Sequence, residues 1–179
     1  MLSILKIDGY RYSSKKRTLI KVFFTDPGFR YLIFFRLCKR YKNKSLLSVF
    51  FRILLNLTKG RYSIQIPIHT HIKKGFLINH YGGIVINQGV VIGENCNVSQ
   101  GVTIGNVSRG KLKGCPIIGD RVWIGANSVV VGKITIGNDV LIAPLSYINF
   151  DVPDNAVVMG NPAKIISYNG SGSYIKNIN

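Results

Sequence analysis

The sequence predicts a mainly β fold, a solenoid of short strands and tight turns that follows a basic, helical N-terminal segment. The leading observation is an aliphatic side chain at every sixth position between residues 118 and 148 (Ile118, Ile124, Val130, Ile136, Ile142 and Ile148). This period matches neither the period of about 3.6 of a helix nor the period of about two of a lone strand. It fits a coil in which the repeated side chains all point into one shared core.

The same period continues towards the N-terminus, but its phase slips twice. It holds within residues 86–104 and within residues 66–78 (Ile104, Val98, Ile92, Ile86; Ile78, Ile72, Ile66). One slip of two residues lies between Ile78 and Ile86, and a longer one lies between Ile104 and Ile118. Regular repeats are scaffold, and interruptions are where a solenoid has room for chemistry. We therefore expect the functional residues at the two slips.

Length and composition limit the class of protein. A chain of 179 residues forms one domain, or one domain with an extension, and a hydrophobic fraction of 46% excludes global disorder. The formal net charge is +17, and residues 1–62 hold 15 Lys+Arg against 2 Asp+Glu. Such a segment suits nucleic acid, anionic lipid or a polyanionic substrate, or is simply a solvated basic surface.

The three cysteines, Cys38, Cys96 and Cys115, share no C-x-x-C spacing. This argues against a disulfide framework or a zinc knuckle and favours a reducing compartment. No signal peptide is visible, and the apolar stretch 45–57 is interrupted by Arg52 and too short to span a bilayer. We expect a cytoplasmic protein.

Two helices are expected in the basic segment. Asp26 and Pro27 form a helix start, residues 42–44 break this helix, and a second one covers 45–57 and ends at Gly60. One interpretation is that their aromatic faces cover the open end of the solenoid. The other is a peripheral position on the inner membrane face, with the basic rim towards the lipid, and both can hold at different surfaces. Nucleic acid is disfavoured, because no base-stacking motif or recognition helix is present.

The first slip contains Asn79, His80 and Tyr81, followed by two glycines. An imidazole at such a corner can take a proton from a hydroxyl group near neutral pH, although a lone histidine is more often structural. His69 and His71 lie two residues apart, but no third ligand follows at a suitable spacing. We therefore predict no metal site and treat these two histidines as surface residues.

The second slip, residues 106–116, is long enough to form a protruding arm. It carries Arg109, Lys111 and Lys113, which suit a phosphate-bearing ligand. Cys115, near its end, has no paired base in the sequence that would make it a nucleophile. No phosphate-binding loop, nucleophile elbow or carboxylate pair is present, which argues against nucleotide hydrolysis and glycosidase chemistry.

Together these features resemble the left-handed β-helix hexapeptide-repeat acyltransferases. The resemblance rests on the hexads, the Asn79-His80 corner, the segment 100–105, the arm 106–116 and the ending 160–164 (Gly-Asn-Pro-Ala-Lys). Within these enzymes the similarity is greatest to serine acetyltransferase and its relatives that O-acetylate surface polysaccharides. It covers 63–166, which we treat as the catalytic domain between the helical segment 1–62 and a polar tail 167–179.

The resemblance implies acetyl transfer from acetyl-CoA to a hydroxyl group in a homotrimer, without a metal. His80 matches the general base of these enzymes. Coenzyme A is expected between adjacent subunits, near Gly105, Gly125, Ala126 and Lys164. A backbone N–H at a glycine turn such as Gly105 would stabilise the oxyanion.

Four residues, at three sites, depart from the pattern of serine acetyltransferase. Asn79 and Gln65 replace aspartates that support the base, and Gly114-Cys115 replaces an Arg-His pair that helps to hold the amino acid. We expect Asn79 and Gln65 to support His80 through neutral hydrogen bonds.

These departures argue against serine as the acceptor. We expect transfer to a sugar hydroxyl in surface (capsular or O-antigen) polysaccharide biosynthesis, with Tyr81, Arg109 and Cys115 at the saccharide. The alternatives are a serine O-acetyltransferase of cysteine biosynthesis and a non-enzymatic trimeric binding scaffold.

Overall fold

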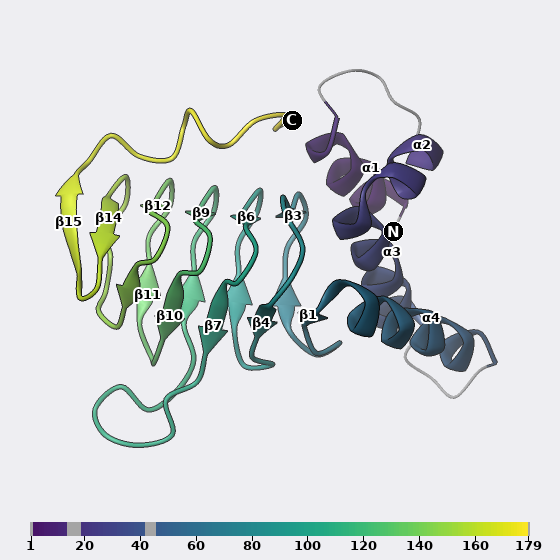
Figure 1. Ribbon diagram of the computed structural model, residues 1–179, viewed down its shortest axis with the longest axis horizontal. Helices are drawn as coiled ribbons and strands as arrows, with labels where there is room; N and C mark the ends of the chain where they lie inside the picture. Colours follow the sequence, from purple (N-terminus) through teal and green to yellow (C-terminus); the bar gives the residue numbers. More distant parts are fainter. Residues whose placement is uncertain (1, 14–18, 42–45, 179) are drawn as a thin grey trace.

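The structure, a computed structural model that describes residues 2–13, 19–41 and 46–178, consists of a helical cap at one end of a parallel β-helix (Figure 1). The cap contains α1 (Leu2–Arg11), α2 (Leu19–Thr25), α3 (Pro27–Arg40) and α4 (Leu46–Tyr62). The helix break expected at 42–44 lies outside the described residues. In this described part, no helix is long and apolar enough to cross a bilayer.

The helix expected to end at Gly60 continues to Tyr62, so that prediction is wrong. A glycine inside a helix costs about 1 kcal/mol, but Tyr62 is buried against the first coil and holds the last turn in place. Ser63, with φ at +49°, then turns the chain into the first strand.

Three parallel sheets form the faces of the β-helix. The five-stranded sheet contains β1 (Ile64–Gln65), β4 (Ile84–Ile86), β7 (Thr103–Gly105), β10 (Val129–Val131) and β13 (Tyr147–Ile148) in that order. The four-stranded sheet contains β2 (His71–Ile72), β5 (Val91–Ile92), β8 (Ile117–Ile118) and β11 (Thr135–Ile136). The six-stranded sheet contains β3 (Leu77–Ile78), β6 (Asn97–Val98), β9 (Trp123–Ile124), β12 (Leu141–Ile142), β14 (Val157–Gly160) and β15 (Ala163–Ser167), of which β15 alone pairs antiparallel.

The strand register explains both phase slips. Val129 pairs with Tyr147, 18 positions later, which is three repeats of six and therefore one coil. Ile64 pairs with Ile84, 20 positions later, because the first slip adds two residues at a corner. Thr103 pairs with Val129, 26 positions later, because the arm adds eight. The mainly β, parallel architecture with a helical N-terminus is confirmed.

The apolar residues of the repeat fill one continuous core, which extends into the helical cap. Ile86, Ile104 and Val130 are each at most 1% exposed, and they share this core with Tyr31 and Phe35 of α3. The Tyr31 hydroxyl donates to the Ile66 carbonyl at 3.0 Å. The interpretation that the helices cover the open end of the solenoid is therefore confirmed.

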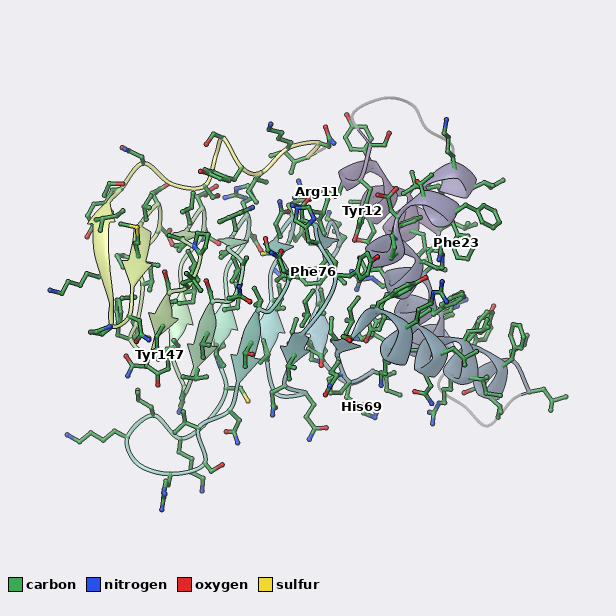
Figure 2. All side chains as sticks on the ribbon, in the orientation of Figure 1. Arg11, Tyr12, Phe23, His69, Phe76 and Tyr147 are labelled. Carbon is green, nitrogen blue, oxygen red and sulfur yellow. The ribbon has the colours of Figure 1, made fainter. Side chains whose placement is uncertain are left out.

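The C-terminal tail meets the end of α1 beside the six-stranded sheet. From β15 the tail runs back over this sheet towards α1 (Figure 1), and the Tyr174 ring lies 4.7 Å from the Trp123 ring. Arg11 at the end of α1 points towards the first coils (Figure 2), where its guanidinium donates to the carbonyls of Gly75 and Lys176. The cap thus contacts both the first coils and the tail.

Candidate functional site

His80 lies at the corner between β3 and β4, and its side chain is exposed. The imidazole makes no hydrogen bond or ion pair with another described residue. A small hollow of about 160 Å³ lies beside it, lined by Asn79, Tyr81 and residues from the helical cap, among them Tyr12 and Asp26. An exposed, unbonded imidazole is free to exchange a proton with a bound ligand.

The helical cap positions both sides of this corner. The Tyr12 hydroxyl accepts a hydrogen bond from the Ile78 N–H at 2.8 Å, and burial raises the pKa of this phenol, so it stays neutral. The Tyr81 ring lies 5.3 Å from the ring of Tyr62 at the end of α4. Tyr81, half exposed, is therefore held beside His80 by the last turn of α4.

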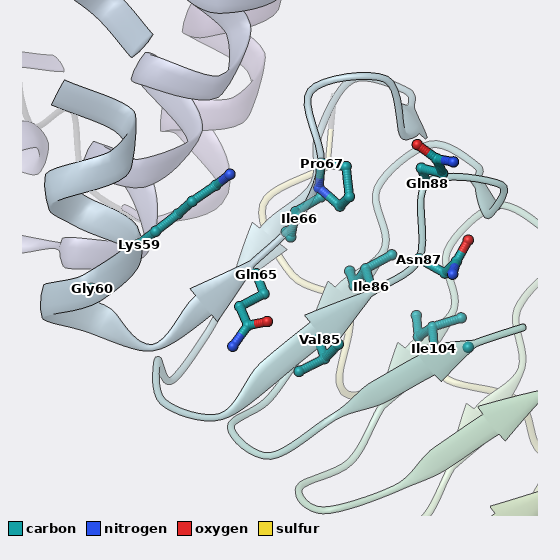
Figure 3. A pocket seen from close by; sticks show the side chains of 11 residues that line it. Lys59, Gly60, Gln65, Ile66, Pro67, Val85, Ile86, Asn87, Gln88 and Ile104 are labelled. Atoms are coloured by element: carbon teal, nitrogen blue, oxygen red, sulfur yellow. The ribbon is translucent and has the colours of Figure 1, made fainter. Parts of the chain in front are cut away.

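A larger cavity of about 700 Å³ lies on the outer face of the five-stranded sheet, over strands β1, β4 and β7 (Figure 3). Gln65, Val85 and Gly105 come from three adjacent strands, and Asn87 and Gln88 form its rim where β4 ends. Because side chains alternate along a strand, the partners Gln65 and Val85 face outwards while Ile64 and Ile86 face the core.

Lys59 of α4 supplies a cation to this cavity. An adjoining hollow of about 280 Å³ shares Lys59 and Pro67 and adds Arg52 and His69. The sequence analysis missed Lys59, Asn87 and Gln88. The strand register would have placed Asn87 and Gln88 beside the outward side chain of Val85, but no sequence pattern brings Lys59 to this sheet.

Gln65 and His80 lie in different hollows, and no hydrogen bond joins them. The expectation that Gln65 orients the imidazole is therefore wrong within one chain. The Gln65 side chain lies on the face of the five-stranded sheet, whereas His80 lies at the corner that precedes β4. Asn79 stays next to His80, and its backbone N–H is fixed to the Val98 carbonyl at 3.0 Å.

The arm begins after β7, at the opposite edge of the five-stranded sheet. It closes through an antiparallel bridge in which Val107 and Gly114 exchange backbone hydrogen bonds of 3.0 and 2.9 Å. Arg109, near the tip, is exposed. The Cys115 thiol donates to the Asn87 side-chain oxygen at 3.4 Å, and burial raises the pKa of Cys115. A raised pKa disfavours the thiolate and therefore a nucleophilic role.

The expected site residues thus divide between two edges of one sheet. His80 precedes β4, and Gly125 and Ala126 precede β10, so all three lie at the edge where these strands begin. Gly105 and Cys115 lie at the edge where the strands end. Gly125 is buried, and a Cβ there would stand 2.6 Å from the Pro144 nitrogen, so the close approach of the next coil requires glycine.

Two further expectations concern Lys164 and the two histidines, His69 and His71, which the sequence predicts to be surface residues rather than metal ligands. Lys164 is exposed on β15, at the far end of the six-stranded sheet from β3, so one chain does not bring it near His80. His69 and His71 are exposed. Within residues 2–13, 19–41 and 46–178, no group of three or more His, Cys, Asp or Glu side chains could hold a metal ion.

Comparison with known proteins identifies the family. Residues 115–149 match the family described as Bacterial transferase hexapeptide (six repeats). The chain is 31% identical over 141 residues to a serine acetyltransferase of Helicobacter pylori, which covers 79% of this chain and 82% of that protein. The chain belongs to the serine acetyltransferase family.

Other members of the serine acetyltransferase family match over more of this chain but are longer. The chain is 30% identical to a serine acetyltransferase of Synechococcus elongatus over 86% of its own length and 63% of that protein. The structure of the Brucella abortus serine acetyltransferase in complex with coenzyme A matches with a TM-score of 0.79 and 25% identity. This match covers 93% of the present chain and 67% of the Brucella chain.

The family assignment corrects the expected function. The prediction of a polysaccharide O-acetyltransferase with a saccharide acceptor is wrong, because these relatives and this solved structure are serine acetyltransferases. The resemblance to hexapeptide-repeat acyltransferases is confirmed. The substituted residues Asn79, Gln65 and Cys115 favoured another acceptor, but the similarity over 79% of the chain outweighs them.

Proposed function

We propose that this protein is a serine O-acetyltransferase, which transfers the acetyl group of acetyl-CoA to the side-chain hydroxyl of L-serine. The observation that carries the proposal is the structural match to a coenzyme A-bound serine acetyltransferase over 93% of the chain. The exposed, unbonded imidazole of His80 at the first slip supplies a base within that fold.

In the proposed reaction His80 accepts the proton of the serine hydroxyl as the oxygen attacks the thioester carbonyl. The tetrahedral oxyanion then collapses, the C–S bond breaks, and the coenzyme A sulfur leaves with the proton that His80 returns. General base catalysis by a positioned side chain contributes about 10²–10⁴-fold to such a rate.

The two edges of the five-stranded sheet suggest how the site is completed. We place the acceptor at His80, Asn79 and Tyr81, and the acetyl donor at Gly105 and the arm, whose exposed Arg109 suits the phosphates of coenzyme A. These edges face away from each other in one chain, so in the proposed enzyme one subunit supplies each edge. The resemblance to the hexapeptide-repeat acyltransferases favours a homotrimer with a left-handed coil. Gly125, Ala126 and Lys164 would then line the donor groove from the neighbouring subunit.

Asn79 gives this acceptor site a distinct chemistry. A neutral amide beside His80 can hydrogen-bond the serine ammonium group without adding a negative charge near the base. It also stabilises a protonated imidazole less than a carboxylate would.

The experiment measures thiol release from acetyl-CoA by the purified protein with and without L-serine, in the parent chain and in His80→Ala. We expect serine-dependent release that falls about 10²–10⁴-fold in His80→Ala. His71→Ala is the matched control, because His71 is also an exposed histidine but lies on the four-stranded sheet. Binding of acetyl-CoA without serine-dependent release would refute the acceptor, and an unchanged rate in His80→Ala would refute the base.

A further inference from the structure

Helix α4 carries a row of apolar side chains that faces solvent. Leu46, Phe50, Ile53 and Leu57 are 90%, 53%, 54% and 65% exposed. Residues at this spacing lie on one side of a helix. The opposite side of α4 is also apolar and is in use, since Leu55 and Tyr62 are buried in the shared core. We call Leu46, Phe50, Ile53 and Leu57 the outer stripe.

The surroundings of the outer stripe are cationic. Arg52 and Arg61 of α4 are exposed, as is Arg40 at the end of α3. No aspartate or glutamate occurs between Asp26 and Glu94, a segment that contains 11 Lys+Arg. An apolar row bordered by basic residues, without acidic ones, is the pattern of a helix that lies in the interface of an anionic bilayer.

A second copy of this chain that contacts the outer stripe through its own α4 is a poorer occupant. A twofold contact through α4 would bring Arg52 and Arg61 towards their own copies, since the same patch faces itself in such an interface. Helices α2, α3 and α4 contain no acidic residue that could pair with these arginines. Lipid phosphates and serine headgroups supply the missing negative charge.

We propose that α4 docks on an anionic lipid surface. The outer stripe enters the boundary between headgroups and acyl chains, and Arg40, Arg52 and Arg61 contact lipid phosphates. Figure 1 shows α4 at the end of the molecule opposite β15, so the solenoid can extend away from the surface. Lys59, on the same helix, lines the 700 Å³ cavity, which places that cavity beside the docked helix.

The test is flotation of the full chain with vesicles of phosphatidylcholine, with and without about one third phosphatidylserine. We expect binding to the anionic vesicles that weakens at high salt, because the cations are screened. Phe50→Ser combined with Ile53→Ser should weaken binding by about tenfold or more, because two apolar anchors are lost. Arg52→Gln combined with Arg61→Gln should weaken it by a similar factor, since each cation near the surface contributes about fivefold.

The matched control is Ile166→Ser combined with Tyr168→Ser, which removes two apolar side chains that are 53% and 62% exposed at the other end of the molecule. Its binding should equal that of the parent chain. All substituted residues are exposed, and unchanged thermal unfolding will verify that the variants fold. Absence of flotation at every salt concentration, or unchanged binding of the Phe50/Ile53 variant, would overturn the proposal. It would also be overturned if the parent chain self-associated in sedimentation velocity without binding vesicles and the Phe50/Ile53 variant lost this self-association, because a second copy would then cover the stripe.

Discussion

The buried ion pair between Asp8 and Arg36 should determine how firmly the helical cap is attached. The Arg36 guanidinium donates to the Asp8 carboxylate at 2.9 Å and to the carbonyls of Ile72 and Lys73 at 2.6 Å each. Asp8 is fully buried and Arg36 is 8% exposed. One arginine thus joins α1 and α3 to the turn after β2.

Replacing Arg36 by Met leaves the Asp8 carboxylate buried without its cation. Removing one partner of a buried ion pair lowers the free energy of unfolding by about 3–5 kcal/mol. For a chain of this size, about 2–4 °C per kcal/mol gives a fall of about 6–20 °C in Tm. Urea unfolding followed by circular dichroism measures the loss. Arg121→Met is the control, because the Arg121–Asp139 pair is 38% and 32% exposed and should contribute less than about 1 kcal/mol.

The Arg36→Met deficit should also depend on pH. Burial raises the pKa of Asp8 above its usual value of 3.8, and Arg36 opposes that rise. Without Arg36 the pKa of Asp8 in the folded state rises further. Protonation of Asp8 therefore stabilises the folded variant, and this stabilisation is complete at a pH below the pKa of Asp8 in the unfolded chain. That contribution is lost as the pH rises through the folded-state pKa. The deficit should therefore be larger at pH 8 than at pH 5. A deficit below about 1 kcal/mol, or one that is equal at the two pH values, would refute this account of the cap.

Three more predictions concern the site and the tail. Because burial raises the pKa of Cys115, its alkylation by iodoacetamide should be slower than that of a free thiol, and the rate should still increase above about pH 8.5. Mass spectrometry measures the rate of alkylation, and fast modification at pH 7 would contradict the prediction. Gly125→Ala should lose about 1–3 kcal/mol in urea unfolding, because the new Cβ meets backbone at 2.6 Å. Gly105→Ala should lose less, because its nearest contact is a Val131 methyl at 3.3 Å, and equal losses would contradict the packing argument. Tyr174→Ala should shift the emission of Trp123, the single tryptophan, to longer wavelength, and an unshifted spectrum would mean that the tail does not cover it.

The solenoid could be predicted from the sequence because its period is local. Each coil needs three inward side chains at a spacing of six, so the aliphatic residues record the coil directly, and the two slips record where residues are added. Register follows by counting: Val129 pairs with Tyr147 because 18 residues make one coil.

The site could be predicted only in part, since it depends on which corner or face each residue occupies. The sequence analysis singled out His80, which is exposed at a corner as expected of a base. It paired His80 with Gln65, although Gln65 projects from the face of a strand into another cavity. Lys59 lines that cavity from the last turns of α4, which continue through Gly60 to the buried Tyr62, and the local sequence does not show that this end of α4 packs against the first coil.

The division of the site between two edges follows from the parallel strands themselves. In a parallel sheet every residue that precedes a strand lies at one edge and every residue that follows a strand lies at the other. His80 precedes β4, whereas Gly105 ends β7 and the arm follows it. Each of these coils crosses the sheet from the first edge to the second, so no change of side-chain conformation can bring the imidazole to the arm within one chain. In the proposed acyl transfer, which uses both, one of the two edges therefore comes from a second subunit, and assembly of the protein is part of that proposal.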